Sequence, residues 1–111
     1  KRPPKWLNVI VEKLNDEFIE TPTNESLSML ADVHPVHMAA IFRKFHKQTI
    51  GEYVQNKRIK YASRLLLNKE IPLSEVALSS GFSDQSHFNR VFKRFTRLTP
   101  GEFRKTISGR K

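Results

Sequence analysis

Side chains that can hydrogen-bond to the edges of DNA bases are concentrated near position 90 of this chain. Gln85, Asn89 and Arg90 lie within six residues of one another, and Ser86 stands among them. Arginine can donate two parallel hydrogen bonds to O6 and N7 of guanine, and glutamine or asparagine can form a similar pair with adenine. A serine hydroxyl can serve either base. We therefore predict that this segment discriminates between bases.

Basic side chains that could bind phosphate accompany this segment and an earlier one. We assign to phosphate the residues Lys44, Lys47, Lys93, Arg94, Arg97 and Arg104. The 111-residue chain has 20 Lys and Arg against 11 Asp and Glu, a net charge of +9. Residues 34–64 hold seven basic and one acidic side chain and residues 84–111 hold eight and two, whereas residues 1–33 hold four and six. This distribution predicts a polyanionic partner at the two basic segments.

The two basic segments are copies of one pattern. MAAIFRKF at residues 38–45 recurs fifty positions later as FNRVFKRF, and TIGEY at residues 49–53 recurs as TPGEF. Farther upstream we align Leu30-Ala31 with Val76-Ala77, a shift of forty-six, which predicts a turn four residues longer in the second copy. Each copy reads as a short helix, a turn and a longer helix, which is the helix-turn-helix arrangement.

Apolar residues in each longer helix form one stripe, so the opposite side is expected to face solvent. The stripes are Met38, Ile41, Phe42 and Phe45, then Phe88, Val91, Phe92 and Phe95. Their spacing marks these aromatic residues as core rather than as platforms for base stacking. At about 100° per residue, the outward sides carry Val36, Ala39, Ala40, Arg43, Lys44 and Lys47, then Ser86, Asn89, Arg90, Lys93, Arg94 and Arg97.

The first outward side offers fewer hydrogen-bond donors than the second. The side chains of Val36, Ala39 and Ala40 cannot donate a hydrogen bond. Direct readout there would rest on thymine methyl groups and on the side chains of His34, His37 and Arg43. We expect the second helix to carry more of the hydrogen-bonded base discrimination.

Helical spacing and end signals predict an all-α fold of about seven helices. We expect helices over about 5–20, 35–48, 51–68 and 84–96, with shorter ones capped by Ser26, around Leu73 and opened by Thr99. The short helix after Ser26 should turn Leu27, Leu30 and Ala31 inward. Capping boxes are expected for Thr49 with Glu52 and for Thr99 with Glu102, and Gly81 suits a left-handed turn.

These elements predict two helix-turn-helix subdomains of homeodomain-like architecture, joined by a long helix. We place a flexible linker at 1–4, the first subdomain at 5–50, the linker helix at 51–69, the second subdomain at 70–105 and a flexible tail at 106–111. The opening residues read as a linker, so we expect the chain to be part of a longer protein.

Several classes of function lack support in the sequence. The absence of cysteine excludes disulfides, thiolate metal sites and thiol nucleophiles. We predict no metal, no cofactor and no catalysis, because the four histidines lack completing ligands and no nucleophile–base pair is recognisable. No apolar run approaches the ~20 residues of a membrane span, so we expect a cytoplasmic, nucleoid-associated protein. The main alternative is a non-specific nucleic-acid-binding protein; an enzyme or a basic membrane-surface module explains the repeat less well.

Residues 27–104 resemble the DNA-binding domain of the AraC/XylS family of bacterial transcription regulators. The resemblance rests on IPLSEVA at 71–77, GFSDQSHFNRVFKRF at 81–95 and TPGEFR at 99–104. It implies two helix-turn-helix subdomains whose recognition helices enter successive major grooves on one face of double-stranded DNA. It also implies control of transcription initiation, usually as an activator that contacts RNA polymerase, and an effector or sensor domain in a separate N-terminal part.

The same resemblance implies which residues face the bases. Carried over by position, these are Val36, Ala39, Ala40 and Arg43 in the first helix, then Gln85, Ser86, His87 and Arg90 in the second. Here the small apolar set in the first helix departs from the family, whose members often carry polar readers at these positions.

Overall fold

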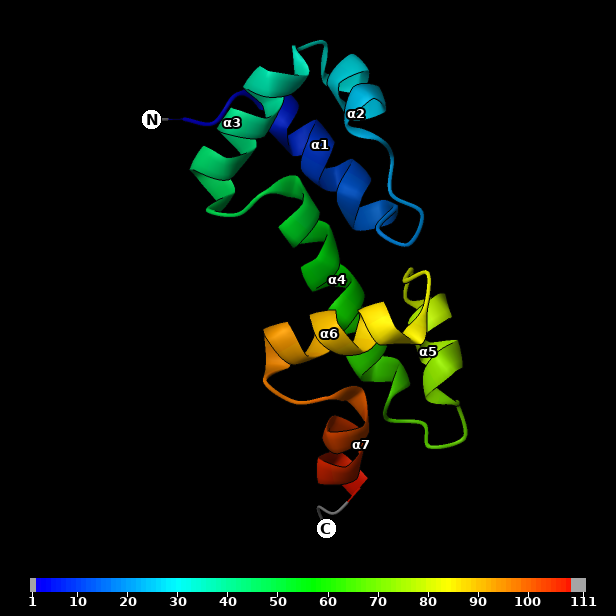
Figure 1. Ribbon diagram of the computed structural model, residues 1–111. Helices are drawn as coiled ribbons and strands as arrows, with labels where there is room; N and C mark the ends of the chain where they lie inside the picture. Colours follow the sequence, from blue (N-terminus) through cyan, green and yellow to red (C-terminus); the bar gives the residue numbers. More distant parts are fainter. Residues whose placement is uncertain (1, 109–111) are drawn as a thin grey trace. The chain divides into compact units, whose positions relative to one another are not determined.

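The computed structural model describes residues 2–108, and within that range the chain forms seven helices and no strand (Figure 1). The helices are α1 (Lys5–Asp16), α2 (Asn24–Ala31), α3 (Pro35–His46), α4 (Ile50–Leu65), α5 (Leu73–Ser79), α6 (Gln85–Thr96) and α7 (Pro100–Ser108). The predicted all-α class and number of helices are confirmed. None of these helices is long and apolar enough to cross a membrane.

The chain divides between Val54 and Gln55 into two compact units, each with its own hydrophobic core. The first core is formed by Leu7, Ile10, Leu14, Leu27, Met38, Phe42, Ile50 and Val54. The second core is formed by Ile59, Ala62, Leu66, Val76, Ala77, Phe82, Phe88, Val91 and Phe92. The division falls within α4, for which we predicted a linker over residues 51–69. This helix therefore supplies buried side chains to each unit, and it ends at Leu65, before the predicted boundary.

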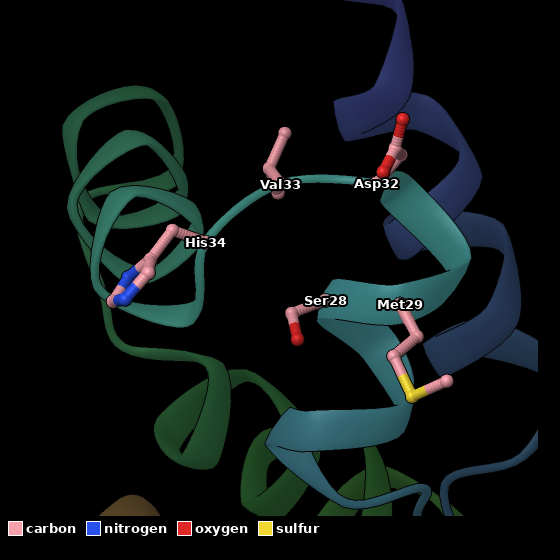
Figure 2. A pocket seen from close by; sticks show the side chains of 5 residues that line it. All are labelled: Ser28, Met29, Asp32, Val33 and His34. Carbon is pink, nitrogen blue, oxygen red and sulfur yellow. The ribbon is translucent and has the colours of Figure 1, made fainter.

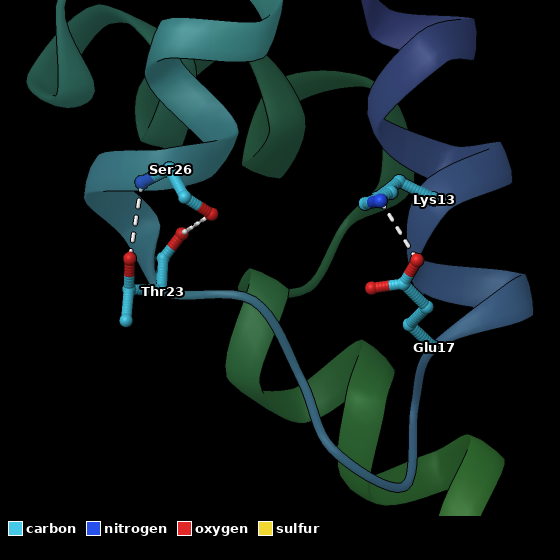
Figure 3. A network of polar contacts seen from close by, with 4 residues as sticks. All are labelled: Lys13, Glu17, Thr23 and Ser26. Atoms are coloured by element: carbon cyan, nitrogen blue, oxygen red, sulfur yellow. Dashed lines mark hydrogen bonds and ion pairs between the residues drawn. The ribbon is translucent and has the colours of Figure 1, made fainter.

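The first helix ends at Asp16, four residues earlier than predicted. The backbone N–H of Glu17 still bonds to the carbonyl of Lys13 at 2.9 Å, and the two side chains form an ion pair at 2.7 Å (Figure 3). Phe18 then leaves the helix and packs against the first core. Thr21 Oγ1 donates to the carbonyl of Phe18 at 3.1 Å, which stabilises this non-helical path.

The second helix is capped by Thr23, not by Ser26 as predicted. Thr23 Oγ1 accepts a hydrogen bond from the N–H of Ser26 at 3.0 Å, so the cap lies three residues earlier (Figure 3). Leu27 is buried as expected, whereas Leu30 is 50% exposed, contrary to the prediction. The inward position is taken by Ser28, whose hydroxyl donates to a backbone carbonyl one turn earlier at 2.9 Å.

The turns after α2 and α5 correct the upstream alignment of the two copies. Asp32 and Gly81 both have positive φ, 57° and 96°. The same pair of hydrogen bonds closes each helix, the pattern of the Schellman motif: Asp32 N–H to the Met29 carbonyl and Val33 N–H to the Ser28 carbonyl, then Gly81 N–H to the Leu78 carbonyl and Phe82 N–H to the Ala77 carbonyl. Upstream residues therefore correspond at a shift of forty-nine, not forty-six.

This correction explains the exposure of Leu30. At a shift of forty-nine Leu27 matches Val76, and both are buried, while Leu30 matches Ser79, and both are exposed. The second turn contains one additional residue rather than four, because the helix caps His34 and Asp84 are fifty positions apart.

Both predicted capping boxes are confirmed. Thr49 Oγ1 accepts from the N–H of Glu52 at 3.0 Å, and the Glu52 carboxylate accepts from the N–H of Thr49 at 2.8 Å. The corresponding distances for Thr99 and Glu102 are 3.1 and 2.9 Å. The hydrogen bond from the Thr99 backbone is the main cause that lowers the pKa of Glu102.

The last helix extends to Ser108, so residues 106–108 of the predicted flexible tail are helical. The remaining residues of that tail, 109–111, and the first residue of the predicted linker lie outside the described range. Residues 2–4 precede α1 and are not helical.

Candidate nucleic-acid interface

The outward side of α3 is a mixed apolar and basic surface. Met38 and Phe42 are fully buried on its inner side. The outward residues are all exposed: Val36, Ala39, Ala40, Arg43 and Lys44, with Lys47 just beyond the helix. Val36, a large apolar residue, is 71% exposed. The outward side predicted from the helical spacing is therefore the exposed side of α3.

The outward side of α6 is polar and basic. Phe88, Val91 and Phe92 are buried in the second core, and the rings of Phe88 and Phe92 make an edge-to-face contact at 5.6 Å between centroids. The exposed residues are Ser86, Arg90, Lys93 and Arg94, with Arg97 just beyond the helix. Gln85, His87 and Asn89 are partly exposed. A basic face thus occurs twice, each time fixed by a stripe of buried aromatic and aliphatic residues.

Different chemical groups cap the two helices. His34 Nδ1 accepts a hydrogen bond from the N–H of Val36 at 3.1 Å, whereas the carboxylate of Asp84 accepts from the N–H of His87 at 2.8 Å. Each cap satisfies a backbone donor that the first turn of a helix leaves without an intrahelical partner. The imidazole of His34 can accept only through an unprotonated nitrogen, so Nδ1 is not available to donate to a base.

A shallow hollow of about 370 Å³ lies beside the His34 cap, between α2 and the start of α3. Ser28 and Met29 line it from α2, and Asp32 and Val33 from the turn, while His34 lies at the first turn of α3 (Figure 2). No group of His, Asp and Glu side chains able to hold a metal ion occurs within residues 2–108.

His37 and His87, at corresponding positions, both lie against aromatic rings. The ring centroids of His37 and Trp6 are 6.1 Å apart, and those of His87 and Phe82 are 5.6 Å apart in an edge-to-face arrangement. The contact gives the partly buried His87 a packing role, whereas His37 remains exposed beside Trp6. His87, which the family resemblance assigned to base readout, is thus partly buried against Phe82.

Lys44 and Arg94 also correspond, and each lies over the next aromatic residue. The Lys44 ammonium is 5.5 Å from the ring centroid of Phe45, and the Arg94 guanidinium is 5.5 Å from that of Phe95. Arg94 additionally donates from Nη2 to the side-chain oxygen of Gln55 at 2.6 Å. Gln55 had no signal in the sequence, because it lies 39 residues before its partner.

Lys47 and Arg97 end the two helices in the left-handed conformation. Their φ angles are 62° and 71°, and their N–H groups bond to the carbonyls of Arg43 and Lys93 at 2.9 and 2.8 Å. This conformation disfavours residues with a Cβ atom, and glycine would adopt it without that cost. A cation at a helix C-terminus complements the helix dipole.

Arg104, which we predicted as a phosphate ligand, uses part of its guanidinium within the fold. Its Nε donates to the carbonyl of Leu66 and its Nη2 to that of Asn68, both at 3.0 Å. These carbonyls lie at the C-terminal end of α4 and in the turn that follows, where backbone acceptors lack helical partners. Arg104 therefore stabilises the link between α4 and α7.

Asn89 departs in part from the outward-facing prediction. The side-chain oxygen of Asn89 is buried without a hydrogen-bond partner in the described part of the chain. Arg58 lies 5.9 Å from the ring centroid of Phe82, and burial lowers the pKa of its guanidinium. Basic residues on α4 could therefore not be assigned to DNA from charge alone.

Comparison with known proteins places this geometry among regulators of transcription. A family model described as a helix-turn-helix domain matches residues 27–106. The chain is 34% identical over 100 residues to the probable transcription factor PqrA of Proteus vulgaris, a match that covers 90% of this chain and 78% of that protein. It is 31% identical over 90 residues to the regulatory protein SoxS of Salmonella typhimurium, with 80% and 84% coverage.

A third relative is longer than this chain. The bifunctional transcriptional activator/DNA repair enzyme AdaA of Bacillus subtilis is 31% identical over 100 residues, which are 90% of this chain but 47% of AdaA.

Solved structures share the fold. The C-terminal domain of AraT, a response regulator from Geobacillus stearothermophilus, aligns with a TM-score of 0.85 at 23% identity, covering 96% of this chain and 88% of that one. The DNA-binding domain of AdpA, solved in complex with a target DNA, also gives 0.85, at 22% identity and with 100% and 97% coverage.

Proposed function

Because the chain belongs to the AraC/XylS family of helix-turn-helix transcription regulators, we propose that α3 and α6 each enter a major groove and read base sequence there. In this proposal the two grooves are successive ones on one face of double-stranded DNA. The observation that carries it is the repeated exposed basic face, which occurs on α3 and again on α6 over two separate cores.

The side chains of α6 have the chemistry for direct readout. The exposed guanidinium of Arg90 suits O6 and N7 of guanine, and Gln85 suits adenine. Ser86 lies on the same exposed side. Asn89 can read a base after its side chain turns outward, a change that would also release its buried oxygen from a site without a partner.

Phosphate contacts surround the base-reading positions. We assign them to Lys44, Lys47, Lys93, Arg94 and Arg97, which are all exposed. Arg104 is left out because two of its donors bond to backbone carbonyls. Such contacts position the protein on the duplex, whereas the base contacts supply specificity.

Competition between DNA duplexes tests sequence specificity against the alternative of non-specific binding. A duplex selected by the chain from a random pool is labelled and displaced by the same duplex or by one of shuffled sequence. We expect the shuffled duplex to be at least a thousandfold weaker, the lower range for specific binding. Near-equal displacement would favour the non-specific alternative.

Family membership supports further proposals about the whole protein. We infer that it activates transcription in the cytoplasm by contacting RNA polymerase, without catalysis of its own, and that an effector or sensor domain lies in another part of the polypeptide. Transcription in vitro from a promoter that carries the selected duplex should rise when the protein is added. A fall would indicate a repressor.

A further inference from the structure

The first two turns of α3 present an outward surface without side-chain hydrogen-bond donors. Val36, Ala39 and Ala40 are exposed there, and Val36 leaves 71% of its surface to solvent. At corresponding positions α6 carries Ser86, Asn89 and Arg90, all of which can donate. The two helices share a fold but differ in what their outward surfaces can recognise.

Two exposed histidines flank this surface, and each keeps a ring N–H that can donate, but neither belongs to the set formed by Val36, Ala39 and Ala40. Nδ1 of His34 accepts the N–H of Val36 and so caps the helix. His37 packs its ring near Trp6, with the centroids 6.1 Å apart. Arg43, one turn after Ala39, is the next residue on this side whose side chain can donate two hydrogen bonds to a base.

An apolar side chain in the major groove can recognise one base substituent, the methyl group on C5 of a pyrimidine. Thymine carries this group, and so does 5-methylcytosine, whereas uracil and unmethylated cytosine do not. We propose that the surface formed by Val36, Ala39 and Ala40 reads C5-methyl groups, so that it accepts thymine and 5-methylcytosine and discriminates against their unmethylated counterparts. This inference rests on the proposed entry of α3 into the major groove.

The expected effect follows from the size of one methyl group. Burying one such group changes affinity about fourfold, and two would give about a fifteenfold change. The same replacement beneath α6 should have little effect, because readout there uses hydrogen bonds that the methyl group does not alter.

The experiment uses a duplex that the chain selects from a random pool. Each thymine is replaced in turn by deoxyuridine, which removes the methyl group and keeps every hydrogen-bonding group. At each sensitive position a cytosine–guanine pair is then compared with its 5-methylcytosine counterpart. We expect about fourfold weaker binding without the methyl group in both comparisons, confined to one half of the duplex.

Reciprocal substitutions assign that half to α3. Val36→Ser should reduce the sensitivity to deoxyuridine, and Ser86→Val, at the corresponding position of α6, should create such sensitivity in the other half. Leu78→Ala is the control for loss of an exposed apolar side chain, since Leu78 is 62% exposed on α5. Each position is exposed, and unchanged helix content by circular dichroism verifies folding of the variants.

The outcomes separate this inference from the proposed function. Methyl recognition alone would be overturned if deoxyuridine at every position changed the affinity by less than 1.5-fold. In free energy this is roughly a third of the expected effect. Equal sensitivity in the parent chain and in Val36→Ser would also overturn it, because the methyl contact would then lie elsewhere. If the chain selects no preferred duplex, the proposed sequence-specific binding itself fails.

Discussion

Single residues on the two exposed faces divide into groups that a binding experiment can tell apart. Arg90 is exposed and suited to a base edge, whereas Lys93, three residues later, is assigned to phosphate. Spacing alone predicted that both side chains point outward. It could not show that Arg94 would bond to Gln55 or that Arg104 would turn to backbone carbonyls, since their partners lie 39 and 36–38 residues away in the sequence.

The variants Arg90→Ala and Lys93→Ala should weaken DNA binding in different ways. Arg90→Ala is expected to cost about 1–3 kcal/mol on the preferred duplex and to relax the choice of one base. Lys93→Ala should weaken binding to all duplexes by a similar factor. Affinities measured on the preferred duplex and on single-base variants distinguish the two, and an equal loss of Arg90→Ala on all sequences would make that residue a phosphate contact.

The left-handed conformation of Lys47 predicts that two substitutions which both remove its charge differ in protein stability but not in DNA binding. The free energy of unfolding of Lys47→Gly should be about 1 kcal/mol higher than that of Lys47→Ala, because glycine adopts positive φ without a Cβ penalty. Both variants should bind DNA equally weakly, because both lack the ammonium group. Urea unfolding and DNA titration measure the two effects, and equal stability of the variants would contradict the structural account of φ.

Among the structural elements, helices with clear end signals were predicted best. Both capping boxes were recognised because Thr and Glu at fixed spacing leave few alternatives. The early end of α1 and the turn after α2 were missed for another reason. In both places buried partners distant in sequence decide the path: Phe18 packs on the first core, and Leu27 rather than Leu30 faces inward.

The capping box of α7 predicts a pH dependence of stability. The folded-state pKa of Glu102 is lowered, mainly by the Thr99 backbone N–H. Its stabilising contribution is therefore present above the unfolded value of about 4.3 and is lost as the pH falls through the folded pKa. Glu102→Gln keeps the hydrogen-bonding pattern of the box but cannot titrate. The fall in thermal midpoint between pH 7 and pH 3 should thus be smaller in the variant, and an unchanged fall would refute this linkage.

Hydrogen bonds from Arg104 stabilise the backbone at the C-terminal end of α4. Arg104→Ala should lower the free energy of unfolding by about 1–2 kcal/mol, because it leaves two carbonyls without their charged donor at a partly exposed site. It should leave the salt dependence of DNA binding unchanged. The matched control Arg97→Ala should instead reduce that dependence by one phosphate contact. A reduced salt slope in Arg104→Ala would return this residue to the phosphate-binding set.

At the scale of the whole molecule, charge and repetition were the informative signals. The net charge of +9 and its concentration after residue 33 predicted a polyanionic partner, and the fifty-residue repeat predicted two similar units. We predicted α4 as one linker helix with a single buried stripe, although its apolar positions are interrupted by the polar residues 55–58, where its buried side chains divide between the two cores.

The five assigned phosphate contacts predict the salt dependence of binding by the intact chain. Each contact contributes about −0.9 to the slope of log affinity against log salt, so the slope should be about −4.5. Affinity should then fall about 500-fold between ~50 and ~200 mM salt. Fluorescence anisotropy at several salt concentrations measures the slope, and a value near −1 would exclude a broad phosphate interface.

The separate cores have a consequence for how operator preference can change over evolution. Each proposed reading surface is anchored by its own set of buried side chains, so exchanging the outer residues of one helix leaves the core beneath the other unchanged. Preference for one half of a binding site can thus drift, or be engineered in hybrid regulators, while the other half is conserved.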